Sequence, residues 1–285
     1  VEYASEYRYR NPITGDKTLT IIISQSGETA DTLAALKEAK KRGSHTLAIV
    51  NVVGSSIANA ADDVIYTWAG PEIAVATTKG YSTQLSVLYL FAVWAARLLK
   101  TADGARLDKI FDDILMLPEL TERVISAEPQ IKETAKRCGD PESLFFIGRN
   151  IDYAVSLEAS LKLKEISYIH SEAYAAGELK HGTISLIEEG RTVIALAAYE
   201  ELFDKLLSNI KEVRARGARV LACATVGHTE IAKEAESVIY IPKIDPLLLA
   251  SLEVVPFQLY AYYVALYNGC DIDKPRNLAK SVTVE

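Results

Sequence analysis

Apolar residues in this 285-residue chain fall into short uninterrupted runs, separated by segments whose apolar positions have helical spacing. Residues 18–24 (TLTIIIS) form a β-branched run of strand length, and residues 30–42 (ADTLAALKEAKKR) place helix formers before Gly43, a helix-stop residue. Residues 45–53 and 63–66 repeat the strand pattern. Strands without polar alternation, joined through helices, predict a parallel sheet covered on both faces.

The same order of elements returns in the second half of the chain. Residues 191–198 form an apolar run, a helical segment ends at Gly217, and further strands follow at 218–226 and 238–240. The sequence Val-Ile-Tyr occurs at 64–66 and again at 238–240, and these two copies are as far apart in the chain as Gly43 and Gly217. This recurrence predicts an internal duplication. The fold class is therefore α/β, with two doubly wound subdomains built on parallel sheets.

The second copy opens with an additional strand at 143–147 and its helix, whereas nothing comparable precedes residues 1–10. We therefore expect the first copy to lack its N-terminal strand and helix, and Pro118 to break the helical stretch between the copies. The predicted segments are a first subdomain at 1–100, a helical connection at 101–136, a second subdomain at 137–270 and a C-terminal tail at 271–285.

Composition narrows the classes of function. Apolar residues make up 49% and charged residues 24% of the chain, as in ordinary globular proteins. The net charge of −7 leaves no basic footprint for nucleic acid. Three distant cysteines and four histidines show no metal-ligand spacing, so neither a metal nor a cofactor is predicted.

The longest apolar stretch, residues 85–99, contains Arg97 and is shorter than the roughly 20 residues that a bilayer span requires. It is interpreted as a core helix, so no membrane partner is expected. The first residues, VEYASE, carry no signal pattern. A cytoplasmic location follows as an expectation.

A cluster of polar side chains follows the first predicted strand, where open α/β sheets bind ligands. Ser24, Gln25, Ser26 and Thr29 supply hydroxyl and amide donors, and Gly27 lets the backbone approach an anion. The N-terminus of the following helix adds partial positive charge. No nucleotide-binding glycine motif is present, so the sequence predicts a phosphate site. An ordinary helix cap is the alternative.

Four motifs in this order resemble the isomerase half of the glutamine:fructose-6-phosphate amidotransferase family, the glucosamine-6-phosphate synthases, which consists of two sugar-isomerase (SIS) domains. They are SQSGETADTL at 24–33, AGPEIAVATTK at 69–79, LKLKEISYIHSEAYAAGELKHG at 161–182 and DKPRNLAKSVTVE at 273–285. The resemblance covers essentially the whole chain. The implied substrates are fructose-6-phosphate and glucosamine-6-phosphate in amino sugar biosynthesis, and the implied partner is a glutaminase domain.

The resemblance also assigns residues. Those implied to hold the phosphate or the sugar are Ser24, Gln25, Ser26, Thr29, Val75, Thr77 and Ala279. Those implied to act chemically are Glu165, the base for proton transfer between C1 and C2, Lys162 beside it, His181 for ring opening and Lys280 for the Schiff base. A homodimer is implied, in which His181 serves the neighbouring subunit's site.

Each assignment has a simpler alternative. Glu165, Lys162 and Glu158 share one helix face, which is also the pattern of an exposed salt-bridge ladder. Lys280 can be a solvated tail lysine, whereas His181 lies in a loop setting that suits proton exchange. His45, His170 and His228 receive no function.

The family's first phosphate loop, a Cys-Gly-Thr-Ser segment before VEYASE, and its glutaminase domain have no counterpart in the sequence. We therefore expect the chain by itself not to liberate ammonia from glutamine. Two further alternatives remain open: a phosphosugar-binding module without catalysis, and another sugar-phosphate isomerase or deglycase.

Overall fold

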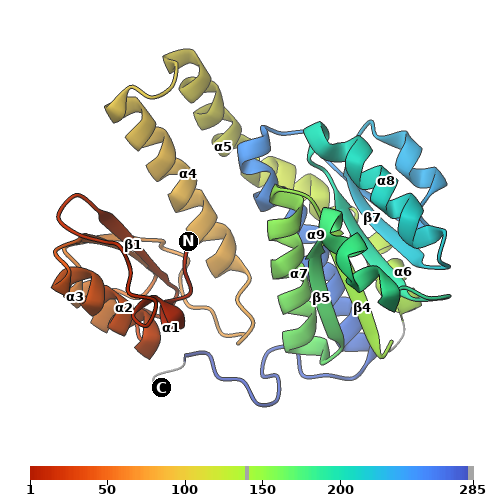
Figure 1. Ribbon diagram of the computed structural model, residues 1–285, viewed down its shortest axis with the longest axis horizontal. Coiled ribbons are helices and arrows are strands. Elements are labelled where there is room, and N and C mark those ends of the chain that lie inside the picture. The colour runs from red at the N-terminus through yellow and green to blue at the C-terminus, as the bar shows by residue number, and fades with distance from the viewer. Residues whose placement is uncertain (139–140, 282–285) are drawn as a thin grey trace. The chain divides into compact units, whose positions relative to one another are not determined.

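The computed structural model describes residues 1–138 and 141–281. Contacts divide this part of the chain into two compact units. Unit 1 comprises residues 1–94 together with the tail from Asn277, and unit 2 comprises Ala95–Arg276. The last four residues of the DKPRNLAKSVTVE motif, 282–285, lie outside the described residues. Figure 1 labels the elements of both units.

Unit 1 is built on a parallel sheet. In its described part the strand order is β1 (Leu19–Ser24), β2 (His45–Val50) and β3 (Asp63–Tyr66). Its helices are α1 (Ala4–Tyr7), α2 (Ala30–Lys41), α3 (Ser56–Ala60) and the first part of α4 (Lys79–Leu99). Ile22, Leu36 and Ile57 form its apolar core together with Ala48 and Val50.

Unit 2 contains a larger parallel sheet whose strand order, in the described residues, is β5-β4-β6-β7-β8. The strands are β4 (Ser143–Gly148), β5 (His170–Ala175), β6 (Thr192–Ala197), β7 (Arg219–Thr225) and β8 (Ser237–Ile241). The α-helices within it are α5 (Gly104–Ile125), α6 (Glu128–Cys138), α7 (Ile151–Ser167), α8 (Phe203–Arg214) and α9 (Leu249–Tyr267).

Short 3-10 helices connect these elements. They are η1 (Ala176–His181), η2 (Thr183–Leu186), η3 (Glu200–Leu202), η4 (Thr229–Lys233) and η5 (Pro246–Leu248). Figure 1 shows α8 on one face of the sheet and α7 with α9 on the other, which is the doubly wound arrangement that the sequence predicts.

The order β1-β2-β3 repeats as β6-β7-β8, so the internal duplication and the α/β fold class are confirmed. In unit 2, β4 pairs with the side of β6 that faces away from β7, and β5 follows β4. The described part of unit 1 has no counterpart of β4 or β5 beside β1. Leu19 and Ile23 of β1 are exposed and alternate with the buried Ile22 and Ser24, so they lie on the opposite face of the sheet from these two residues.

The two long apolar helices differ in burial. α9 packs against α5, α6 and α7, and most of its side chains are buried. Among the described residues of α4, only Gly80 is buried, so the interpretation of 85–99 as a core helix is wrong for this structure. Apolar residues of α4 and of the sheet instead line an open groove that includes Leu47, Val64 and Phe91.

In length and composition, α4 and the segment Pro246–Tyr267 could each cross a membrane. The apolar window of the second segment is 78% buried in the structure, as expected of a core helix. Helix α5 continues through Pro118, so the predicted break is wrong. Leu107, Ile114 and Leu117 on one face of α5 are buried, and this packing offsets the lost backbone hydrogen bond. The helical segment predicted as a connection thus packs within unit 2.

Unit 2 buries two acidic side chains that face each other. Asp152 at the start of α7 accepts hydrogen bonds from the Tyr199 backbone N–H, at 3.0 and 3.3 Å from its two oxygens. Burial raises the pKa of Asp152 to about 8. Burial, and then the charge and hydrogen bond of Asp152, raise the pKa of Glu253 on α9 well above its usual value. The two carboxyl groups therefore hold protons at pH values at which exposed carboxyl groups are ionised.

We predict that Glu253→Gln stabilises unit 2 increasingly as the pH rises. In the folded wild type the two carboxyl groups keep protons that the unfolded chain releases above about pH 4 to 4.5, so folding stability falls with rising pH, by at most about 1.4 kcal/mol per pH unit for each proton. Glutamine cannot ionise, so it removes the contribution of Glu253 to this dependence, whereas the buried Asp152 keeps its own. Urea unfolding at pH 5.5 and 7.5 measures the difference, with the exposed Glu236→Gln as control. Parallel pH dependence of Glu253→Gln and wild type would contradict shared protonation.

Candidate active site

The turn between β1 and α2 is shaped by its own serines. The Ser24 hydroxyl accepts from the Gly27 N–H at 3.1 Å, and the Ser26 hydroxyl accepts from the Glu28 N–H at 3.2 Å. Gly27 has φ +69°, and a Cβ there would lie 2.1 Å from the Ser55 Oγ. Only glycine fits this turn. Both serine hydroxyls still have a proton to donate.

Thr29 occupies the N-cap position of α2, but its side chain makes no capping hydrogen bond in the described structure. The alternative of an ordinary helix cap therefore does not account for its hydroxyl. The carboxylate of Glu28 accepts from the Ser56 hydroxyl at 2.7 Å and from the Ser56 N–H at 2.8 Å. These two bonds lower the pKa of Glu28 and engage its charge at the start of α3. The turn thus presents hydroxyls and a helix N-terminus to an anion.

A second loop, residues 72–78, packs against this turn. The buried Glu72 carboxylate accepts from the Thr78 N–H at 2.9 Å and from the Gly80 N–H at 3.2 Å. A Cβ on Gly80 would lie 2.9 Å from Thr77 and 3.0 Å from Gln25. The absence of a side chain at Gly80 lets the Gln25 and Thr77 side chains approach each other at the start of α4.

The C-terminal tail reaches both loops. The Lys280 ammonium donates to Glu72 at 2.8 Å, to the Ala74 carbonyl at 2.9 Å and to the Thr77 hydroxyl at 3.4 Å. Lys280 is therefore not the solvated tail lysine of the simpler alternative.

Beside it, the Ser281 hydroxyl donates to the Ser26 hydroxyl at 3.2 Å. Unit 1 thus brings together the sequence-predicted residues of three segments. These are Ser24, Gln25, Ser26 and Thr29 in the turn, Val75 and Thr77 in the second loop, and Ala279 and Lys280 in the tail.

Sequence reasoning missed Glu72, whose side chain is only 3% exposed. Burial by itself would raise the pKa of Glu72, but the hydrogen bond from Lys280 and the two N–H groups at the start of α4 hold it below its usual value. Glu72 lies inside the 69–79 motif, yet no spacing connects it with a lysine 208 residues away. Only the folded chain reveals the pair.

In unit 2, Lys162 lies between two carboxylates on one face of α7. Its ammonium is 2.5 Å from Glu165 and 3.6 Å from Glu158. The Lys162 side chain is only 5% exposed and the Glu165 side chain 23%. Burial first, and then the nearby Glu165, raise the pKa of Glu158 to about 7, although Lys162 opposes this. The group is therefore mostly buried rather than the exposed ladder of the simpler alternative, and Glu165 is the more exposed of its two carboxylates.

His181 is the last residue of η1 and is exposed. Gly182 follows it with φ 143° and ψ −53°, a conformation that requires glycine. η1 continues from β5, whose last residue pairs with Gly148 just before α7, whereas Glu165 is near the other end of α7. A helix of 17 residues is about 25 Å long. Within one chain the structure does not bring His181 and Glu165 together.

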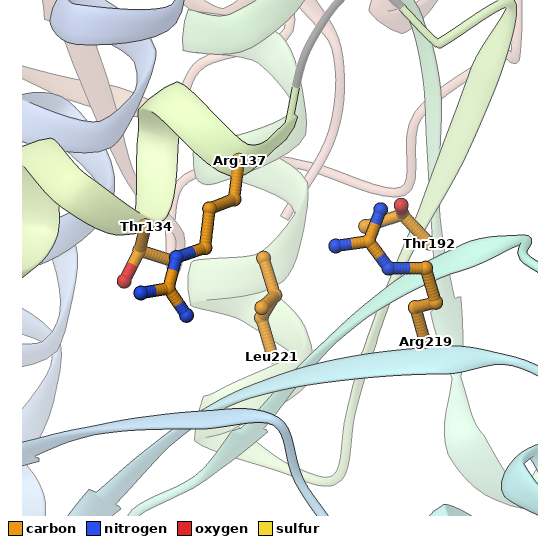
Figure 2. Close-up of a pocket in the computed structure, with 5 residues that line it drawn as sticks. All are labelled: Thr134, Arg137, Thr192, Arg219 and Leu221. Atoms are coloured by element: carbon orange, nitrogen blue, oxygen red, sulfur yellow. The ribbon is translucent and has the colours of Figure 1, made fainter.

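The described residues contain no group of three or more His, Cys, Asp or Glu side chains able to hold a metal ion. Figure 2 shows a pocket lined by Thr134, Arg137, Thr192, Arg219 and Leu221. Thr192 and Arg219 begin β6 and β7, so the pocket lies at the opposite edge of the sheet from the usual ligand position. Its volume of about 10 Å³ holds one water, and its two arginines pair with Glu133 and Glu236.

Comparison with known proteins identifies the family. The model of the SIS domain matches residues 1–94 and 140–267. The chain is 57% identical over all 285 residues to a glutamine--fructose-6-phosphate aminotransferase [isomerizing] of Clostridium tetani, and 50% identical to that of Methanosarcina mazei. It covers 47% and 46% of these relatives, so it spans about half of their length.

Solved structures agree with this match. The C-terminal domain of glucosamine-fructose-6-phosphate aminotransferase from Francisella tularensis has a TM-score of 0.92 and 36% identity, with 96% of this chain and 78% of that chain covered. A glucosamine-6-phosphate deaminase from Thermotoga maritima has a TM-score of 0.76 and 26% identity, with 98% and 80% covered. The duplicated parallel sheets, the serine-rich turn and these matches together show that the chain belongs to the SIS domain family.

Proposed function

We propose that this chain is the phosphosugar isomerase part of a glutamine–fructose-6-phosphate aminotransferase. Its substrates are fructose-6-phosphate and ammonia, and its product is glucosamine-6-phosphate. The turn of Ser24, Gln25, Ser26 and Thr29 binds the phosphate. The likeness to aminotransferases over the whole chain supports this assignment.

The reaction needs ring opening, an imine at C2 and a proton moved from C1 to C2. His181 exchanges the proton that opens the ring. The neutral amine of Lys280 adds to the C2 ketone with loss of water, and ammonia then displaces the lysine. Glu165 removes the proton from C1 and returns it to C2, while Lys162 holds the carboxylate in place. No cofactor takes part in these steps.

One observation favours an enzyme over a binding module: the Lys280 ammonium lies among Glu72, Ala74 and Thr77, in the tail that also contacts the serine-rich turn. A sensor of phosphosugars needs the hydroxyls of the turn but has no use for a lysine held in place beside them. Imine formation requires a lysine nitrogen held in a fixed place beside the sugar, and the contacts of Lys280 with this loop provide such a placement.

We propose further that two copies of the chain form each site. In one chain, Glu165 lies near the C-terminal end of α7, whereas His181 in η1 lies near the level of the N-terminal end of α7. The two residues are therefore too far apart to act on the same few atoms of one sugar. A second copy related by a two-fold axis can supply the missing histidine. A homodimer in which His181 serves the neighbouring site accounts for this separation.

We predict that Ser26→Ala weakens binding of glucosamine-6-phosphate by about 1 to 3 kcal/mol, because a hydrogen bond to a charged group is lost. Titration calorimetry with glucosamine-6-phosphate and with glucosamine measures the effect. Ser86→Ala, on α4 outside the turn, is the matched control. Equal affinity of Ser26→Ala and wild type would exclude the turn as the phosphate site.

Lys280 is expected to form the imine. Borohydride reduction with fructose-6-phosphate, followed by peptide mass mapping, should give an adduct on the C-terminal peptide. Lys280→Arg keeps the charge but should lose the adduct, whereas Lys274→Arg, at an exposed lysine of the same tail, should keep it. An adduct spread evenly over exposed lysines, in a preparation that binds the sugar, would rule out this role.

Mixing two inactive variants tests the composite site. Glu165→Gln and His181→Asn should each lose interconversion of fructose-6-phosphate and glucose-6-phosphate. A mixed dimer would contain one site with both wild-type groups, so random reassociation should restore about a quarter of the activity. Mixed dimers that are present by native mass spectrometry but inactive would show that one chain supplies both groups.

A further inference from the structure

A network of polar side chains fixes η1, the segment that ends at His181. Arg149 follows β4, and Asn209 lies on α8 with only 3% of its surface exposed. The Arg149 guanidinium donates from Nε at 3.0 Å and from a terminal nitrogen at 2.9 Å to the Asn209 side-chain oxygen. These two bonds hold the plane of the guanidinium in one orientation.

The oriented guanidinium lies directly against η1. A Cβ on Gly177 would be 3.2 Å from both terminal nitrogens of Arg149 and 3.4 Å from the central carbon. Gly177 has no side chain, so its backbone rests on the guanidinium. The neighbouring Ala176 and Leu179 are fully buried in the core of unit 2. The first turn of η1 is therefore enclosed.

A second contact holds the other end of η1. The Lys180 ammonium is 2.7 Å from a Glu212 oxygen, and the Asn209 amide donates to the other Glu212 oxygen at 3.4 Å. The hydrogen bond from Lys180 lowers the pKa of Glu212. Asn209 thus connects the two contacts, because its oxygen binds Arg149 and its nitrogen binds the partner of Lys180.

The residue after these contacts is His181, and the chain then turns sharply at Gly182. The imidazole itself is exposed, so only the backbone before it sets its direction. We propose that Arg149 and Asn209 are positioning residues that hold η1 so that His181 points to the substrate. This inference rests on the ring-opening role proposed above for His181.

The contact between Arg149 and Asn209 fixes an orientation, which apolar packing would not do. An apolar side chain of similar size at position 209 would fill the same space without needing a partner. Such a side chain would remove the two hydrogen bonds that orient the Arg149 guanidinium. The guanidinium could then move away from Gly177. A misplacement of about 1 Å at a catalytic group can lower a rate on the order of a hundredfold.

Three variants of the full chain separate these effects. Asn209→Leu removes the acceptor for Arg149 and keeps the number and branching of the side-chain heavy atoms. Asn209→Asp keeps an acceptor oxygen and should rescue the orientation. Arg219→Lys is the control, because Arg219 makes the same forked contact to Glu236 at the start of β7, away from η1.

The first readout is the exchange rate between the α and β anomers of glucose-6-phosphate, measured by NMR in the presence of the protein. We expect Asn209→Leu to lower the catalysed rate at least about tenfold, with the dissociation constant of the sugar unchanged. Asn209→Asp and Arg219→Lys should retain the rate. An unchanged rate in folded Asn209→Leu, or a rate that falls only together with sugar affinity, would overturn the proposal.

The second readout does not need catalysis. The chain has four histidines, so their ring signals can be assigned by substitution. In Asn209→Leu the ring signal of His181 should become motionally averaged while those of His45, His170 and His228 stay as in wild type. If His181→Asn leaves anomer exchange intact, the ring-opening role fails, and the ring signal then decides positioning alone. An unaltered His181 signal in Asn209→Leu would overturn it.

Discussion

The ion pair between Lys280 and Glu72 is the interaction on which the candidate site of unit 1 depends. Glu72 accepts from the first N–H groups of α4, and Lys280 adds two further contacts in the same loop. One buried carboxylate thus joins a helix start, a loop and the tail. Removal of Lys280 would leave the buried carboxylate of Glu72 without its ion-pair partner, which costs more than the net stabilisation by an intact pair.

Apolar periodicity predicted the strands, their parallel order and the duplication, because a strand buried on both faces needs a continuous apolar run. It failed where burial depends on distant partners. The apolar pattern of α4 resembles that of α9, but α9 has α5, α6 and α7 around it, whereas the described α4 buries only Gly80. The predicted helix break at Pro118 was wrong for a related reason, since the packing of α5 outweighs one missing backbone hydrogen bond.

The site could be predicted in part. Hydroxyls after a buried strand are a local signal, so the turn at Ser24 was accessible to sequence reasoning. Glu72 and the support of η1 by Arg149 and Asn209 were not, because those contacts join segments distant in the chain. Burial of the Lys162 group was equally hidden, since charged residues three and four apart have the same spacing on an exposed helix and on an enclosed one.

The surroundings of Asp152 show how the two copies differ at equivalent positions. At the end of β1 the chain reads Ser24-Gln25-Ser26-Gly27, and the equivalent stretch after β6 reads Ala198-Tyr199-Glu200-Glu201. There the Tyr199 N–H already donates to the Asp152 carboxylate. A side chain of the protein occupies the place that an incoming anion would take. In the second copy the backbone N–H at this position is thus already bound by a carboxyl group of the protein itself, whereas the turn of the first copy is bound through its serine hydroxyls.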